Sequence, residues 1–208
     1  MKVSVIIPCH SKHFHLLGAL LSQFRNMTVF PNEIVISISG CKKIDPLRIE
    51  TLELFNYPFA LKILKHQEQF DPSDNRNFAC RESTGDLLIC QDADDWPHIQ
   101  RVEIIKCLFE NYKIDYLIHR FTLDPNEWQE RYEIDAARFC TLRRDAVNET
   151  FVHVAQGCPA FTREVFSRVQ WEPFPGGGAE DGWFNSRVAQ VFERSVILSL
   201  PIYYYRLR

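Results

Sequence analysis

The sequence lacks any long apolar segment. A membrane-spanning helix needs about 20 consecutive apolar residues, and the longest candidate, Val196 to Tyr205, is interrupted by Ser199 and Pro201. The apolar stretch near the N-terminus ends at Pro8 and is too short for the core of a signal peptide. We therefore expect a soluble protein without a transmembrane segment.

Excess charge and clustered cysteines are also lacking. The formal net charge of -3 shows no excess of basic residues of the kind that nucleic-acid-binding proteins have, so we expect no nucleic-acid partner. The seven cysteines are scattered and none forms a Cys-x-x-Cys pair, which argues against a zinc site. Reduced thiols in a reducing compartment fit this pattern, and we expect a cytoplasmic location.

Short apolar runs alternate with helical patterns along the chain. The runs are rich in β-branched residues, which is typical of strands buried on both faces of a parallel sheet. Strands are expected at 2–8, 33–39, 61–64, 86–91, 116–123 and 196–200, and helices at 13–26, 45–55, 71–85, 97–112 and 180–192. This order predicts one α/β domain whose central sheet is doubly wound, mainly parallel and flanked by helices.

Polar residues mark the expected ends of two of these helices. Asp45 and Asp71 each precede a proline, which is the order expected for an N-cap followed by the first helical turn. Gly85 is expected to end the helix that begins near Asp71.

Three aspartates follow the fourth expected strand. We expect Asp95 to cap a helix that begins at Trp96-Pro97. Asp92 and Asp94 are two residues apart on an extended segment and so share a face. Mg²⁺ and Mn²⁺ often take one or two carboxylates together with phosphate oxygens. The pattern predicts that Asp92 and Asp94 hold a divalent cation beside a diphosphate.

Two further features each allow two interpretations. Glu180 and Asp181 follow three glycines, and they either occupy the first turn of a helix or present a catalytic base on a mobile loop. Arg76 is either a solvated surface residue or a ligand for phosphate or ribose.

The order of these features resembles the family 2 glycosyltransferases of the GT-A fold. Four segments carry the resemblance, which extends from about Lys2 to Arg206: Val3-Ser4-Val5-Ile6-Ile7-Pro8-Cys9-His10, Arg76-Asn77 with Gly85-Asp86 behind it, Asp92-Ala93-Asp94-Asp95, and Glu180-Asp181. The resemblance implies a Rossmann-like nucleotide-diphospho-sugar transferase domain over residues 1–208. Residues 1–97 would form the nucleotide-binding half and residues 98–208 the half that holds the acceptor and the base.

The same resemblance implies roles for individual residues. Pro8, Cys9 and His10 would line the pocket for the nucleotide base, and Arg76 and Asp92 would contact the nucleotide. Asp94, with Asp92, would hold Mn²⁺ or Mg²⁺. Asp181 would be the catalytic base, with Glu180 contacting the acceptor. The implied reaction is inverting, metal-dependent transfer of a sugar, expected to be UDP-linked, to an acceptor hydroxyl.

One departure from the family pattern concerns the nucleotide base. An acidic residue is usual at the end of the second strand, whereas this chain has Ser37-Ile38-Ser39-Gly40, so Ser39 is the residue expected to hydrogen-bond the base. A third metal ligand is not evident, and His153 is the candidate. The acceptor, whether glycan, protein or lipid, stays open. With so short a chain, a second subunit or another protein is a candidate to complete the acceptor cleft.

Other functions compete with this interpretation. A degenerate domain that binds a nucleotide or a partner without catalysis is the main alternative. A nucleotidyltransferase would share the topology, but it usually has a glycine-rich phosphate loop after the first strand, where this chain has Pro8-Cys9-His10-Ser11-Lys12-His13. A glycoside hydrolase would also use two carboxylates, but it would need no metal-binding acidic pair.

Overall fold

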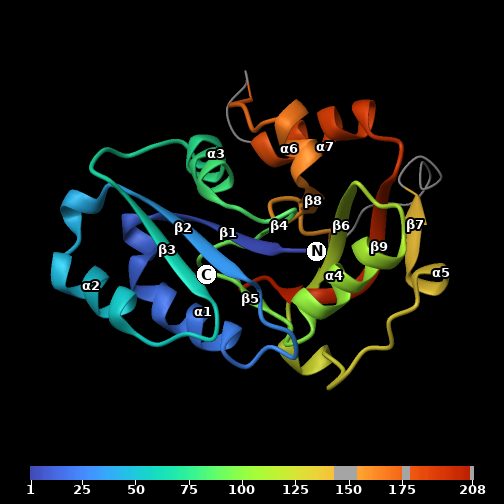
Figure 1. Cartoon of the computed structure of the whole chain (residues 1–208), viewed down its shortest axis with the longest axis horizontal. Coiled ribbons are helices and arrows are strands. Elements are labelled where there is room, and N and C mark those ends of the chain that lie inside the picture. The colour runs from blue at the N-terminus through green and yellow to red at the C-terminus, as the bar shows by residue number, and fades with distance from the viewer. Residues whose placement is uncertain (143–153, 175–178, 207–208) are drawn as a thin grey trace.

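The chain forms a single curved sheet with helices on both faces, as shown in Figure 1. The structure is a computed structural model that describes residues 1–142, 154–174 and 179–206. Within this part of the chain the strand order is β3-β2-β1-β4-β8-β6-β9-β5, and β7 pairs with β9. The strands are β1 (Val3–His10), β2 (Glu33–Ser39), β3 (Ala60–His66), β4 (Leu87–Cys90), β5 (Trp96–Pro97), β6 (Tyr116–Thr122), β7 (Cys140–Leu142), β8 (Ala160–Thr162) and β9 (Ser195–Tyr204).

The long strand pairings are parallel, as predicted. β1 lies between β2 and β4 and is parallel to both, and β6 is parallel to β9. The second half departs from a doubly wound alternation, because the short strand β8 is antiparallel to both β4 and β6. The segment that leads into β8 therefore passes the carboxyl end of β4, where the acidic cluster begins.

The helices cover the two faces of the sheet. They are α1 (Leu17–Phe24), α2 (Pro46–Leu54), α3 (Pro72–Glu82), α4 (Arg101–Asn111), α5 (Ala136–Phe139), α6 (Arg163–Arg168) and α7 (Glu180–Val191), with short 3₁₀ turns at Ser11–Leu16, Cys41–Lys43 and Pro125–Glu127. Val5 and Ile7 of β1 pack in one core cluster with α1 and α4, whereas Ile6 packs on the opposite face with α3, α6 and α7. The sheet is thus buried on both sides, as its β-branched composition predicts.

The N-caps predicted at Asp45 and Asp71 are confirmed, but the helix end predicted at Gly85 is wrong. The side chains of Asp45 and Asp71 accept hydrogen bonds from the first helical turns of α2 and α3. α3 ends at Glu82, and Gly85 instead lies against β1, where a Cβ atom would meet the Ser4 hydroxyl and lie 2.7 Å from the Ser4 backbone nitrogen. A close approach of two backbone segments therefore explains this glycine better than a helix end does.

The predicted capping role of Asp95 is also wrong. Trp96 and Pro97 form β5, which pairs with Tyr203 and Tyr204 of β9, and α4 begins only at Arg101. The Asp95 carboxylate accepts hydrogen bonds from the Tyr203 hydroxyl at 3.0 Å and from the backbone N–H of Arg206 at 2.9 Å. Long-range pairing with β9 overrides the local helix signal at Pro97.

Among the described residues, no helix has both the length and the apolar character that crossing a bilayer demands.

Candidate active site

The predicted nucleotide-binding residues, except Cys9, meet around one cavity at the carboxyl ends of β1, β2 and β4. Its volume is about 370 Å³. Seven of the predicted site residues line it: Pro8, His10, Ser39, Arg76, Asp92, Asp94 and Glu180. Open α/β sheets bind ligands at this edge, so the cavity lies where the sheet topology places a ligand.

Two predicted base-pocket residues differ in detail from expectation. The Cys9 side chain is buried in the core beneath the cavity, so its side chain faces away from any ligand. Ser39 is fully buried, and its hydroxyl accepts a hydrogen bond from Asn75 Nδ2 at 3.2 Å. The same amide donates to the Cys9 carbonyl oxygen at 3.3 Å. Asn75 thus ties the ends of β1 and β2 together under the cavity floor.

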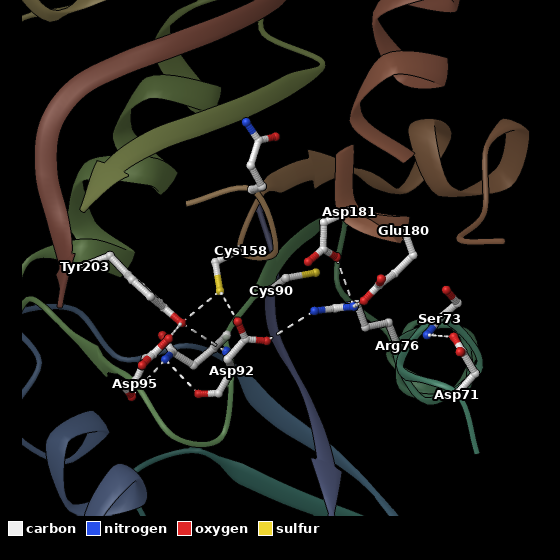
Figure 2. A network of polar contacts seen from close by, with 12 residues as sticks. Asp71, Ser73, Arg76, Cys90, Asp92, Asp95, Cys158, Glu180, Asp181 and Tyr203 are labelled. Carbon is white, nitrogen blue, oxygen red and sulfur yellow. Dashed lines mark hydrogen bonds and ion pairs between the residues drawn. The ribbon is translucent and has the colours of Figure 1, made fainter. Parts of the chain in front are cut away.

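Arg76 occupies the centre of the acidic cluster rather than the protein surface. Its guanidinium is almost completely buried and pairs with three carboxylates, as Figure 2 shows. Nη2 lies 3.3 Å from Asp92 Oδ1, and Nη1 lies 3.0 Å from Asp181 Oδ1 and 3.6 Å from Glu180 Oε1. A buried guanidinium is costly unless it is paired, and these acids supply the pairing. Arg76 therefore links the end of β4 to the start of α7.

Asp92 is held in place at the end of β4 by the C-terminal strand and by the segment before β8. The Asp92 backbone N–H donates to the Tyr203 hydroxyl at 3.4 Å, and the Cys158 thiol donates to Asp92 Oδ2 at 3.4 Å. The Asp92 side chain is still 28% exposed. It therefore has a fixed position and an accessible carboxylate.

The chemistry of the acidic pair fits a hard divalent cation. Asp92 and Asp94 line the same cavity and offer carboxylate oxygens, the ligands that Mg²⁺ and Mn²⁺ prefer. Across residues 1–142, 154–174 and 179–206, no three His, Cys, Asp or Glu side chains converge on one metal position. A pair of carboxylates completed by substrate phosphates remains the arrangement that these residues allow. His153, the predicted third ligand, lies outside the described residues.

Asp181 occupies the first turn of α7, not a mobile loop. Ala179, the residue before the helix, has a left-handed φ of 61°, a backbone conformation that residues other than glycine rarely adopt. Asp181 Oδ1 contacts Arg76, whereas Oδ2 faces Gly157: a Cβ atom on that glycine would lie 2.8 Å from it. One carboxylate oxygen is therefore anchored and the other faces the loop before β8.

The surroundings of Asp181 raise the pKa of its carboxyl to about 6. Burial is the main cause, because it disfavours the charged form. Arg76 acts in the opposite direction by stabilising the carboxylate, while the negative charges of Asp92 and Glu180 raise the pKa further. A carboxyl group with a pKa near 6 is ionised at neutral pH and still accepts a proton readily.

A second cavity, of about 340 Å³, lies on the other side of Asp92. Asp92 and Tyr205 line both cavities, and Asp181 lines the second. The rest of its wall comes from Phe121, Tyr203 and the segment Val154, Ala155, Gln156, Gly157 and Cys158. The two cavities therefore adjoin at the acidic cluster.

The sequence of residues 4–170 matches the family described as glycosyl transferase family 2. This match covers most of the chain. The chain belongs to glycosyl transferase family 2. No curated protein matches the sequence at a significant level.

Solved structures show that this family 2 chain has the GT-A fold. The Staphylococcus aureus TarS 1-349 fragment in complex with UDP is 18% identical and aligns with a TM-score of 0.77 over 100% of this chain and 61% of that fragment. The mannosyltransferase PcManGT from Pyrobaculum calidifontis, in complex with GDP-Man and Mn²⁺, is 18% identical, with a TM-score of 0.67 over 100% of this chain and 57% of that protein. The chain thus spans about three fifths of the length of these two structures.

Several residues around the cluster had no signal in the sequence. Gly157, Cys158 and Tyr203 contact Asp92 or Asp181 across large distances in the chain. Gly157 is an isolated glycine in a segment with no recognisable pattern, and Cys158 is one of seven scattered cysteines. Gly157 and Cys158 reach the site because they precede the antiparallel strand β8, which was not predicted, and Tyr203 reaches it from β9.

Proposed function

We propose that this family 2 chain transfers a sugar from a nucleoside-diphosphate sugar to an acceptor hydroxyl with inversion at the anomeric carbon. We infer a UDP-linked donor, because TarS structures of this fold contain UDP and UDP-GlcNAc. The first cavity, lined by Pro8, His10, Arg76 and Asp92, would hold the nucleotide.

The observation that carries this proposal is that the carboxylates of Asp92 and Asp181 both lie against Gly157. A Cβ atom on Gly157 would lie 2.8 Å from Asp181 Oδ2 and 3.3 Å from Asp92 Oδ2. A carboxylate of the donor cavity and a carboxylate of the second cavity thus face the same small space. Inverting transfer needs a base on the opposite side of the anomeric carbon from the leaving group, and in this proposal the two cavities would hold the donor and the acceptor on those two sides.

In this proposal Asp181 accepts the proton, and Arg76 positions Asp181. Asp181 Oδ2 takes the proton of the acceptor hydroxyl, whose oxygen forms a bond to the anomeric carbon. The bond from that carbon to the phosphate oxygen breaks, and the nucleoside diphosphate leaves with the electron pair. Arg76 holds Asp181 Oδ1 at 3.0 Å, which fixes the direction of the carboxylate. Glu180, which shares Arg76, lies beside the base and lines the donor cavity.

Asp92 and Asp94 would hold Mn²⁺ or Mg²⁺ in this proposal. When bound, such a cation neutralises the negative charge that develops on the departing diphosphate. The Mn²⁺ in the structure of PcManGT with GDP-Man supports this assignment.

Replacement of Asp181 by Asn tests the proposed base. The Asp181→Asn variant keeps the shape of the side chain but cannot accept the proton, so turnover should fall by roughly 10²–10⁴-fold. Release of UDP from UDP-GlcNAc, UDP-glucose and UDP-galactose with Mn²⁺ measures turnover, and calorimetry with UDP measures donor binding. The matched control is Glu193→Gln, because Glu193 is exposed just beyond the C-terminal end of α7.

UDP affinity of Asp181→Asn should stay within about threefold of that of the unmodified protein. A variant that retains more than a tenth of the turnover would show that Asp181 is not the base. If the unmodified protein binds UDP but shows no turnover, the non-catalytic alternative holds instead.

A further inference from the structure

The second cavity contains a side-chain amide whose direction is fixed by α7. Gln156 is exposed and lines this cavity. Asn185 of α7 is fully buried, and its Nδ2 atom donates to the Gln156 carbonyl oxygen at 3.0 Å and to Gln156 Oε1 at 2.6 Å. The buried Asn185 amide therefore donates hydrogen bonds to both the backbone and the side chain of Gln156.

The hydrogen bonds of Asn185 determine which atoms of the two side-chain amides donate and which accept. A backbone carbonyl oxygen can only accept, so Asn185 must present its NH₂ group to Gln156. The other end of that amide, Asn185 Oδ1, accepts from the Tyr116 hydroxyl. Gln156 Oε1 is thus an acceptor toward Asn185, and Gln156 Nε2 is the end directed away from it. Within the described residues, Nε2 has no hydrogen bond, so it is a donor available in the cavity wall.

The residue that carries this donor and the residue proposed as the base are positioned by one face of α7. Asp181 and Asn185 are four residues apart and lie on the same face of the helix. Gln156 and Gly157 are consecutive in the segment that packs against them: Asn185 contacts Gln156, and Asp181 Oδ2 faces Gly157. The wall of this cavity therefore carries both a carboxylate acceptor and an amide donor.

Aromatic side chains form another part of the same wall. The rings of Phe121 and Tyr205 lie 5.5 Å apart with an angle of 48° between them, and both line the cavity. Tyr205 is 46% exposed. A sugar ring has apolar C–H faces and a polar hydroxyl rim, so aromatic faces together with a few hydrogen-bonding groups suit it.

We propose that Gln156 determines acceptor specificity and that the acceptor is an uncharged sugar ring with two adjacent hydroxyl groups. One hydroxyl donates its proton to Asp181 Oδ2 and becomes the nucleophile. The neighbouring hydroxyl oxygen accepts from Gln156 Nε2, while the C–H face of the ring packs on Phe121 and Tyr205. This inference rests on the proposed function, because it takes Asp181 as the base.

Ligand-observed saturation-transfer NMR tests the proposal with the methyl pyranosides of glucose, galactose, mannose and N-acetylglucosamine, in the presence of UDP and Mg²⁺. At least one of them should bind the unmodified protein. Gln156→Glu removes the donor and adds a negative charge beside Asp181, so binding of that glycoside should weaken at least tenfold. Gln156→Met, which lacks the donor but adds no charge, should weaken it about fivefold. Gln67→Glu, an exposed site next to β3, is the matched control.

A deoxy analogue of the binding glycoside sharpens the test. Loss of the hydroxyl that contacts Gln156 should weaken binding to the unmodified protein but not to Gln156→Met, since the partner is already absent. The proposal is overturned if no pyranoside binds, if Gln156→Glu leaves the affinity unchanged, or if glycerol 3-phosphate binds in their place. UDP calorimetry separates the two proposals. If the unmodified protein does not bind UDP, the proposed function is refuted. If it binds UDP but no pyranoside, only this inference is refuted.

Discussion

Arg76 Nη1 lies 3.0 Å from Asp181 Oδ1, so the proposed base is ion-paired to a buried guanidinium. The same guanidinium reaches Asp92 through Nη2, which connects the proposed base to the end of β4. The contact leaves Asp181 Oδ2 as the oxygen available for proton transfer. It also opposes the effect of burial on the pKa of Asp181.

The pH dependence of turnover should report the Asp181 carboxyl. Its pKa is raised to about 6, chiefly by burial, and only the deprotonated form accepts a proton. With a pKa of about 6, the deprotonated fraction rises about tenfold between pH 5 and pH 7. Turnover at saturating donor should rise by about that factor and then level off. A rate that is flat or falls over this range would show that another group limits the reaction.

Gly157→Ala should block proton transfer without disturbing the fold. The added methyl group would lie 2.8 Å from Asp181 Oδ2 and 3.1 Å from Arg76 Nη2. Contacts this short force the carboxylate to move, and a displacement of about 1 Å can reduce turnover by about 10²-fold. Gly18→Ala serves as the control, because a Cβ atom on Gly18 meets no atom within 4 Å. Full turnover by Gly157→Ala, with an unchanged melting temperature, would contradict the assigned geometry.

A buried histidine behind the site should make the fold sensitive to acid. His119 Nε2 accepts a hydrogen bond from Arg101 Nη2 at 3.0 Å, and Nδ1 lies 3.0 Å from the Arg120 carbonyl oxygen. Arginine cannot accept a hydrogen bond, so the imidazole is neutral and carries its proton on Nδ1. Burial, reinforced by the charge of Arg101, lowers the pKa of His119 from 6.5 to about 3.

The sign of the effect on stability follows from proton linkage. Below pH 6.5 the unfolded chain binds a proton at His119 and the folded chain does not, so stability present at higher pH is lost as pH falls. Between pH 8 and pH 5 this residue should lower the free energy of unfolding by about 2 kcal/mol. Urea unfolding at both pH values measures it. In His119→Gln the loss of stability over this interval should be smaller by about that amount, and an equal loss in both proteins would contradict the prediction.

The sequence predicted those parts of the site whose signals are local. The N-caps Asp45 and Asp71 are local features and are confirmed, and Asp92 and Asp94 follow β4 and line the first cavity. The role of Asp95 was misread, because its partner Tyr203 lies 108 residues away. A local Pro signal indicated a helix there, whereas pairing with β9 makes a strand.

Contacts along the second cavity were beyond prediction for the same reason. Gln156 and Asn185 meet only because the antiparallel strand β8 brings the segment before it against α7. Neither residue belongs to a recognisable pattern. Arg76 was recognised as a candidate, but its burial among three carboxylates depends on the packing of α3 against α7 and β4.

Metal-dependent binding of UDP is the most direct test of the account. Calorimetry should show that Mn²⁺ strengthens UDP binding to the unmodified protein at least tenfold, and thermal unfolding should show a matching rise in melting temperature. Asp94→Ala should bind UDP equally weakly with and without Mn²⁺, while the exposed control Glu193→Ala should behave as the unmodified protein does. An Asp94→Ala variant that keeps the full effect of Mn²⁺ would contradict the account.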